Sequence, residues 1–84
     1  MKKQTELLDT ALEALEAQDE TRARKLIARI IRDDPRNDRA WVYAALAADT
    51  ISQKRECLER ALAITPANPQ AKDMMDELEA QGRA

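Results

Sequence analysis

The chain has 84 residues, of which 44% are hydrophobic and 36% are charged, and its formal net charge is −2. This balance is typical of one small globular domain with a modest core, and it argues against a molecule drawn as a whole to nucleic acid or to anionic membrane. With one glycine and three prolines there are few residues for sheet turns, while alanine, leucine, glutamate, arginine and lysine favour helices, so the sequence predicts an all-α fold.

Two amphipathic helices are predicted first along the chain, over residues 5–17 and 20–33. The apolar stripe of the first consists of Leu7, Leu8, Ala11, Leu12 and Leu15. The stripe of the second consists of Ala23, Leu26, Ile27, Ile30 and Ile31. Asp19 is a suitable N-cap residue for the second helix, which must end before Pro35 because a proline disfavours helical geometry in the residue before it.

Three further helices are predicted in the remainder of the chain, over residues 38–48, 51–64 and 69–81. Asn37 can cap the first of them, and Thr50 has capping-box spacing with Gln53 at the start of the second. Asn68 followed by Pro69 gives the last helix an N-cap residue and a proline at its first position. Because the connections are short, consecutive helices should be antiparallel, which gives two helical hairpins and a closing helix.

The sequence repeats with a period of 31 residues, since Pro35 and Asn37 recur as Pro66 and Asn68. A period in this range is typical of stacked helical units that bury their apolar faces against one another. Proteins of this kind usually offer a surface to a partner. The repeat therefore favours binding over catalysis.

Three features of the sequence follow one pattern: Trp41 early in a predicted helix, Ala45 at an expected helix crossing, and the run of residues 61–68. In this respect the chain resembles the tetratricopeptide repeat. The resemblance implies a single domain over 1–84, a right-handed superhelix with repeat one at about 4–35, a shortened repeat two at about 38–66 and a capping helix at about 69–81. It also implies that Trp41 is largely buried between the hairpins, with Ala11 and Ala45 where helices cross.

The same resemblance implies a concave groove for partners, formed by the first helix of each hairpin and by the capping helix. The positions that it assigns to this groove are Thr5, Leu8, Leu12, Leu15, Arg39, Val42, Leu46, Gln70, Asp73 and Glu77. We expect Leu8, Leu12, Val42 and Leu46 to line one continuous surface. The family's clamp for a terminal carboxylate needs lysine and asparagine where Leu8 and Leu12 stand, so the expected ligand is an apolar helical or extended segment of a protein or peptide.

An alternative is that these leucines cover a further layer of helices or a second copy of the chain. The chain would then be a self-association module of a homo-oligomer or of a larger repeat protein. The two hypotheses differ in whether the free chain is monomeric.

No catalytic, cofactor or metal site is predicted. The absence of histidine removes the commonest general base and metal ligand. Cys57 lies beside an apolar stripe and is interpreted as a packing residue rather than a nucleophile. Gly82 is the only glycine, so there is no glycine-rich phosphate loop. The sequence thus predicts a scaffold for protein binding that is not an enzyme.

A row of cations, named here the basic stripe, follows one side of the second predicted helix and consists of Arg22, Lys25, Arg29, Arg32 and Arg36. We favour surface ion pairs with the acidic first helix, worth ~0–1 kcal/mol each. The alternative is a phosphate-binding face for nucleic acid. We consider nucleic acid unlikely because the only aromatic residues, Trp41 and Tyr43, lie on another helix.

Neither a membrane span nor a secretion signal is expected. No apolar run approaches the ~20 residues that a bilayer crossing needs. Glu6 and Asp9 interrupt the N-terminal segment before an apolar signal core can form. The sequence therefore predicts a cytoplasmic protein without membrane contact.

Overall fold

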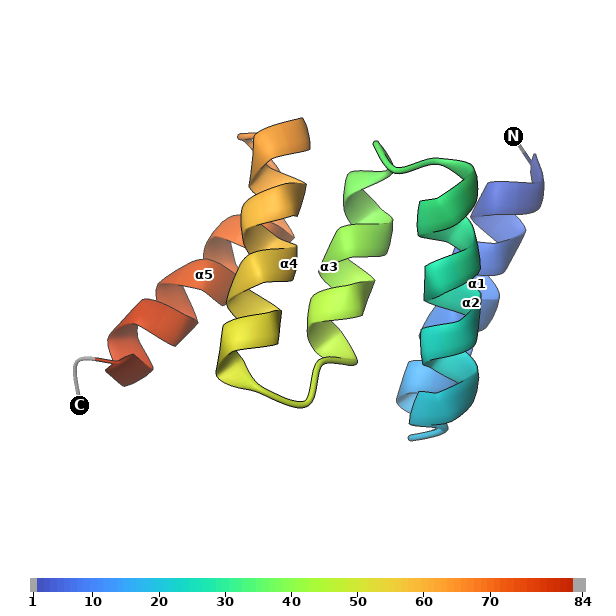
Figure 1. Cartoon of the computed structure of the whole chain (residues 1–84), viewed down its shortest axis with the longest axis horizontal. Coiled ribbons are helices and arrows are strands. Elements are labelled where there is room, and N and C mark those ends of the chain that lie inside the picture. Colours follow the sequence, from blue (N-terminus) through green and yellow to red (C-terminus); the bar gives the residue numbers. More distant parts are fainter. Residues whose placement is uncertain (1, 83–84) are drawn as a thin grey trace.

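The computed structural model describes the backbone of residues 2–82 and the side chains of residues 5–82. Within this range the chain forms five helices and no strand (Figure 1). The helices are α1 (Lys2–Glu16), α2 (Glu20–Asp33), α3 (Asp38–Leu46), α4 (Ile51–Ile64) and α5 (Pro69–Gly82). The predicted all-α class is confirmed for the described range, while residues 1, 83 and 84 of the predicted domain lie outside it.

The predicted N-caps are all formed. Asp19 Oδ1 accepts a hydrogen bond from the Arg22 backbone N–H at 3.3 Å. The corresponding distances are 3.2 Å from Ala40 N to Asn37 Oδ1, 3.1 Å from Gln53 N to Thr50 Oγ1 and 3.0 Å from Ala71 N to Asn68 Oδ1. These side chains satisfy backbone donors that have no partner within the helix, which fixes where α2 to α5 begin.

One helix is shorter than predicted, because α3 ends at Leu46 and not at Ala48. The Ala48 N–H donates to the Ala45 carbonyl at 3.3 Å, three residues back, so the last turn is tightened. Thr50 is already extended, with φ −121° and ψ 155°, as the cap of α4 requires. The chain therefore needs residues 47–49 to turn between the two helices.

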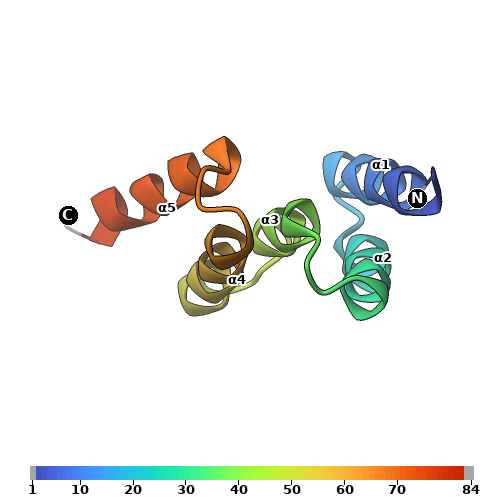
Figure 2. The same cartoon turned by 90° about the horizontal axis from the view of Figure 1, so that it is seen from above.

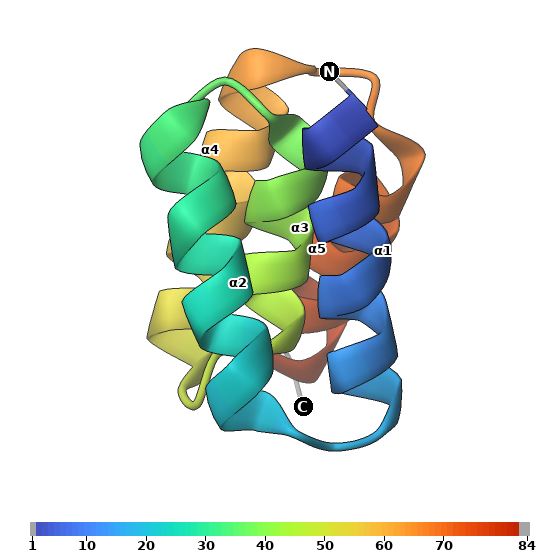
Figure 3. The same ribbon diagram turned by 90° about the vertical axis from the view of Figure 1, so that its right-hand side faces the viewer.

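The helices are arranged around α3. The hairpins α1–α2 and α3–α4 are the most closely packed pairs, α3 also contacts α2 and α1, and α5 packs on α4. Seen from above, α1 and α5 lie on one side of α3, and α2 and α4 lie on the other (Figure 2). In the end view, α4 lies behind α2 and α5 lies behind α1 (Figure 3). In Figure 1 α2 and α4 run upward and α3 runs downward, so α2 and α4 point in the same direction.

The core is built from a few branched side chains and many alanines. Ile30 and Leu58 are fully buried, and Val42 is 1% exposed. Ala11 and Ala45 are also fully buried, as expected of small residues where helices approach closely. Each buried leucine or isoleucine contributes about 1.5–3 kcal/mol through removal of apolar surface from water. None of the described helices is long and apolar enough to span a bilayer.

A polar contact joins the start of α3 to the start of α5. The Asn68 Nδ2 donates to the Asp38 carboxylate at 2.8 Å. Partial burial opposes the charge of this carboxyl, but hydrogen bonds from Asn68, Thr65 and the backbone outweigh burial and hold the pKa of Asp38 below its usual value. The charged form is thus the one that the folded state favours.

We expect Asp38→Asn to lower the thermal unfolding temperature at pH 7. Because the folded pKa of Asp38 is lowered, its charge stabilises the fold above the unfolded pKa of about 3.9, and this contribution is lost as the pH falls further through the folded value. The difference between parent and variant should therefore shrink toward pH 3. Thermal unfolding followed by circular dichroism at pH 7 and at pH 3 measures this difference. Asp73→Asn, at an exposed position, is the control. A difference that is independent of pH would contradict the assignment.

Candidate binding cleft

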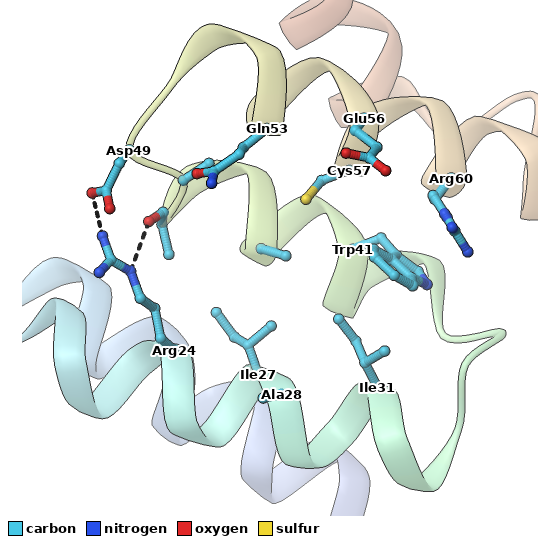
Figure 4. Close-up of a pocket in the computed structure, with 13 residues that line it drawn as sticks. Arg24, Ile27, Ala28, Ile31, Trp41, Asp49, Gln53, Glu56, Cys57 and Arg60 are labelled. Carbon is cyan, nitrogen blue, oxygen red and sulfur yellow. Dashed lines mark hydrogen bonds and ion pairs between the residues drawn. The ribbon is translucent and has the colours of Figure 1, made fainter.

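A cleft of about 560 Å³ opens between α2 and α4, with α3 as its floor (Figure 4). This volume is within the range of about 300–1,000 Å³ that is usual for ligand pockets. The walls come from residues spaced three and four apart, which places them on one face of each helix. The wall of α2 consists of Arg24, Ile27, Ala28 and Ile31, and the wall of α4 consists of Gln53, Glu56, Cys57 and Arg60.

The floor of the cleft is made mainly of small apolar side chains. Its lining includes Ala44 of α3 and Ala47 and Ala48 of the turn that follows. Trp41 lies at one end of the cleft (Figure 4). Alanines leave depth between the two walls, because they project only a methyl group from the backbone. A large apolar side chain from outside could therefore reach the floor.

Arg24 closes one end of the cleft and links the two hairpins. Its Nε donates to the Ala47 carbonyl at 3.1 Å, and its Nη2 pairs with the carboxylates of Asp49 and, at 3.3 Å, Glu20. The Ala47 carbonyl lies just past the end of α3, where carbonyl groups have no partner within the helix. Arg24 thus ties α2 to the turn between α3 and α4.

Replacing Arg24 by glutamine should destabilise the protein by about 1 kcal/mol, since it removes a charge-assisted link that is partly screened by solvent. Arg29→Gln is the matched control, because Arg29 is exposed on the same helix. Urea unfolding followed by circular dichroism measures both. Equal stability of the two variants would show that the link contributes nothing.

The other end of the cleft is formed by Trp41 and Arg60. The Arg60 guanidinium carbon lies 5.3 Å from the centre of the indole ring, a cation–π distance, and the Trp41 Nε1 donates to the Pro35 carbonyl at 2.8 Å. Trp41 is partly buried and packs against the core, but it is less fully enclosed than core residues such as Leu58. Its ring borders the cleft, where no helix covers it.

Cys57 lines the wall of α4 and is partly buried. Burial raises the pKa of its thiol, the charge of Glu56 raises it further, and Arg60 opposes this only in part. The thiol is therefore protonated near neutral pH, which agrees with a packing residue and not with a nucleophile.

The groove residues assigned from the sequence do not lie in this cleft. Leu8 and Val42 are buried in the core, Leu12 and Leu15 are partly buried, and Leu46 is 49% exposed. The exposed polar positions are Thr5, Arg39, Gln70, Asp73 and Glu77.

The surface expected along Leu8, Leu12, Val42 and Leu46 is therefore interrupted by two core residues. Leu8 and Val42 are covered because α1 packs against α3 as well as against α2. Helical spacing places Arg39, Val42 and Leu46 away from the Trp41–Ala44 face of α3. The cleft between α2 and α4 and the groove expected along α1 and α5 thus lie on opposite sides of α3, because α2 and α4 lie on one side of that helix and α1 and α5 on the other (Figure 2).

The basic stripe is exposed along its whole length. Among residues 5–82 the ion pairs are those of Arg24, so the expected pairing between the acidic first helix and the basic stripe is not found there. The charges of the stripe face solvent beside the cleft.

The fold and cleft define an all-α chain of two antiparallel hairpins and a closing helix, with a partly open, mainly apolar cleft between the second helices of the hairpins. No family model, curated protein or solved structure matches this chain. The geometry of the cleft is thus the observation that bears most directly on function.

Proposed function

We propose that this chain is a non-enzymatic interaction module that binds a short apolar helical or extended segment of a protein partner in the cleft between α2 and α4. The observation that carries the proposal is an apolar floor of alanines flanked by Ile27 and Ile31, with charged groups at its rim. Recognition sites commonly combine an apolar centre with a polar edge. In this proposal the hairpins are tetratricopeptide-like repeats in a right-handed superhelix.

The dimensions of the cleft fit a segment and not a flat protein surface. The wall of α2 extends from Arg24 to Ile31, and that of α4 extends from Gln53 to Arg60. The first and last residues of each eight-residue wall are about 10 Å apart along the helix axis, which equals two turns of a bound helix. Only a few side chains of a partner can enter at once, so we expect two anchors to dominate the affinity.

Two residues in the cleft report directly on its occupancy. Trp41 is the only tryptophan and Cys57 the only cysteine of the chain, and both line the cleft. A bound segment should change the emission of Trp41 and slow the alkylation of Cys57. Synthetic helical peptides that carry leucines at i and i+4 serve as probes, and peptides with serine at these positions are the control. If the leucine peptides alter neither signal at millimolar concentration, the cleft is not a binding site.

Self-association is the second candidate, and two exposed residues support it. Leu46 is 49% and Ile51 is 59% exposed, at the two ends of the turn between α3 and α4. Sedimentation at two protein concentrations tests this candidate. A mass that rises with concentration in the parent but not in a Leu46→Ser, Ile51→Ser variant would support it, and a monomer at both concentrations would rule it out.

A further inference from the structure

The two walls of the cleft differ in charge. On α2, Lys25 and Arg32 lie three residues before and four residues after Ala28, so they are its neighbours on the helix surface, and both are exposed. On α4, Glu56 lines the cleft and the exposed Glu59 follows it by three residues. A segment in the cleft would therefore meet cations on its α2 side and carboxylates on its α4 side.

The two arginines inside the cleft are already engaged. Arg24 is paired with Asp49 and Glu20, and Arg60 lies over the ring of Trp41. The cations that remain for a partner on the α2 side are thus those at the outer edge. Their long side chains can extend toward a ligand that lies above the floor.

The walls also favour one backbone conformation in the occupant. The backbone groups of α2 and α4 are bonded within their own helices, so the walls offer no ladder of donors and acceptors to an extended strand. A helix satisfies its own backbone groups and needs only side-chain contacts. Helix packing at interaxial distances of about 8–10 Å is compatible with an alanine floor.

We infer, on the basis of the proposed function, that the occupant is an amphipathic helix of a partner protein with carboxylates along the flank that faces α2. Two large apolar side chains at i and i+4, about 6 Å apart along the axis, point to the floor formed by Ala44 and Ala48. The carboxylates pair with Lys25 and Arg32. Charge complementarity of this kind selects the partner and speeds its association.

Three synthetic peptides of about 12 residues, or three helical turns, test this inference. They share two leucines at i and i+4 and differ in one flank, which carries glutamate, lysine or neutral glutamine. Affinity is measured from the emission of Trp41 at near-physiological salt. The glutamate peptide should bind about tenfold more tightly than the lysine peptide, because Lys25 and Arg32 attract a glutamate flank and repel a lysine flank.

The protein variant Arg32→Glu should reduce this difference to less than about threefold, since one of the two cations is reversed. Lys72→Glu is the matched control, because it makes the same charge change at an exposed position of α5, and it should leave the difference unchanged. Circular dichroism confirms that both variants keep the helical content of the parent.

The outcomes separate the inference from the proposed function. If leucine peptides bind equally well with a glutamate or a lysine flank, or better with the lysine flank, the inference that the occupant has an acidic flank is overturned. The cleft would still be a binding site. Leucine peptides that do not bind at all would overturn the proposed function itself. Labelled RNA or DNA that binds more tightly than the glutamate peptide, and loses affinity in Arg32→Glu, would assign the cations to nucleic acid instead.

Discussion

Replacing Leu58 by alanine is expected to cost about 2–5 kcal/mol of stability, because it empties a fully buried position between α4 and the rest of the core. A domain of this size has a total stability on the order of 5 kcal/mol, so the variant should keep at most about 3 kcal/mol and unfold at a much lower urea concentration than the parent. Urea unfolding followed by the helical signal in circular dichroism measures the loss.

Leu46→Ala is the matched control, since it makes the same chemical change at a position that is 49% exposed. It should cost less than about 1 kcal/mol, as surface substitutions usually do. Similar losses in the two variants would mean that the packing of α4 differs from the structure described above.

The second large effect concerns binding. Ala28→Phe should weaken the binding of the leucine peptides by about tenfold or more, because the added ring projects from the wall of α2 into the cleft without entering the core. Ala28 is exposed, so the helical content should stay near that of the parent. Titration of the Trp41 emission measures the affinity.

Ala80→Phe adds the same ring to an exposed position of α5, far from the cleft walls. This control should bind the peptides like the parent. If Ala28→Phe binds as well as Ala80→Phe does, the peptides use another surface, and the groove beside Arg39 and Leu46 is the next to test.

The elements could be predicted because their signals are local. Asp19, Asn37, Thr50 and Asn68 each accept a hydrogen bond from a backbone N–H three residues ahead, so the residue type and its place in the chain are enough to locate the start of a helix. The end of α3 was harder to predict, since nothing in its alanine-rich sequence marks Leu46 as the last helical residue.

The cleft could not be predicted because it depends on which helices become neighbours. Periodicity shows that Leu8 and Val42 are apolar positions, but not that α1 also packs against α3 and covers them. One signal for the cleft was present in the sequence: Ala28 beside Ile27 and Ile31 makes the apolar face of α2 wider than the core alone requires. A second cluster of alanines lies across the cleft from it, with Ala44 in α3 and Ala47 and Ala48 in the turn that follows.

The common direction of α2 and α4 has a consequence for the orientation of whatever helix lies between them. The aligned peptide dipoles of a helix place partial positive charge at its N-terminus and partial negative charge at its C-terminus. Since both walls point the same way, their fields add at the ends of the cleft, and the shorter α3, which runs the opposite way, offsets them only in part. An occupant that runs opposite to both walls, and thus parallel to α3, is favoured over the reverse orientation. The cleft therefore has a polarity, so that a bound peptide and the same peptide with its sequence reversed should differ in affinity even when their side chains are identical.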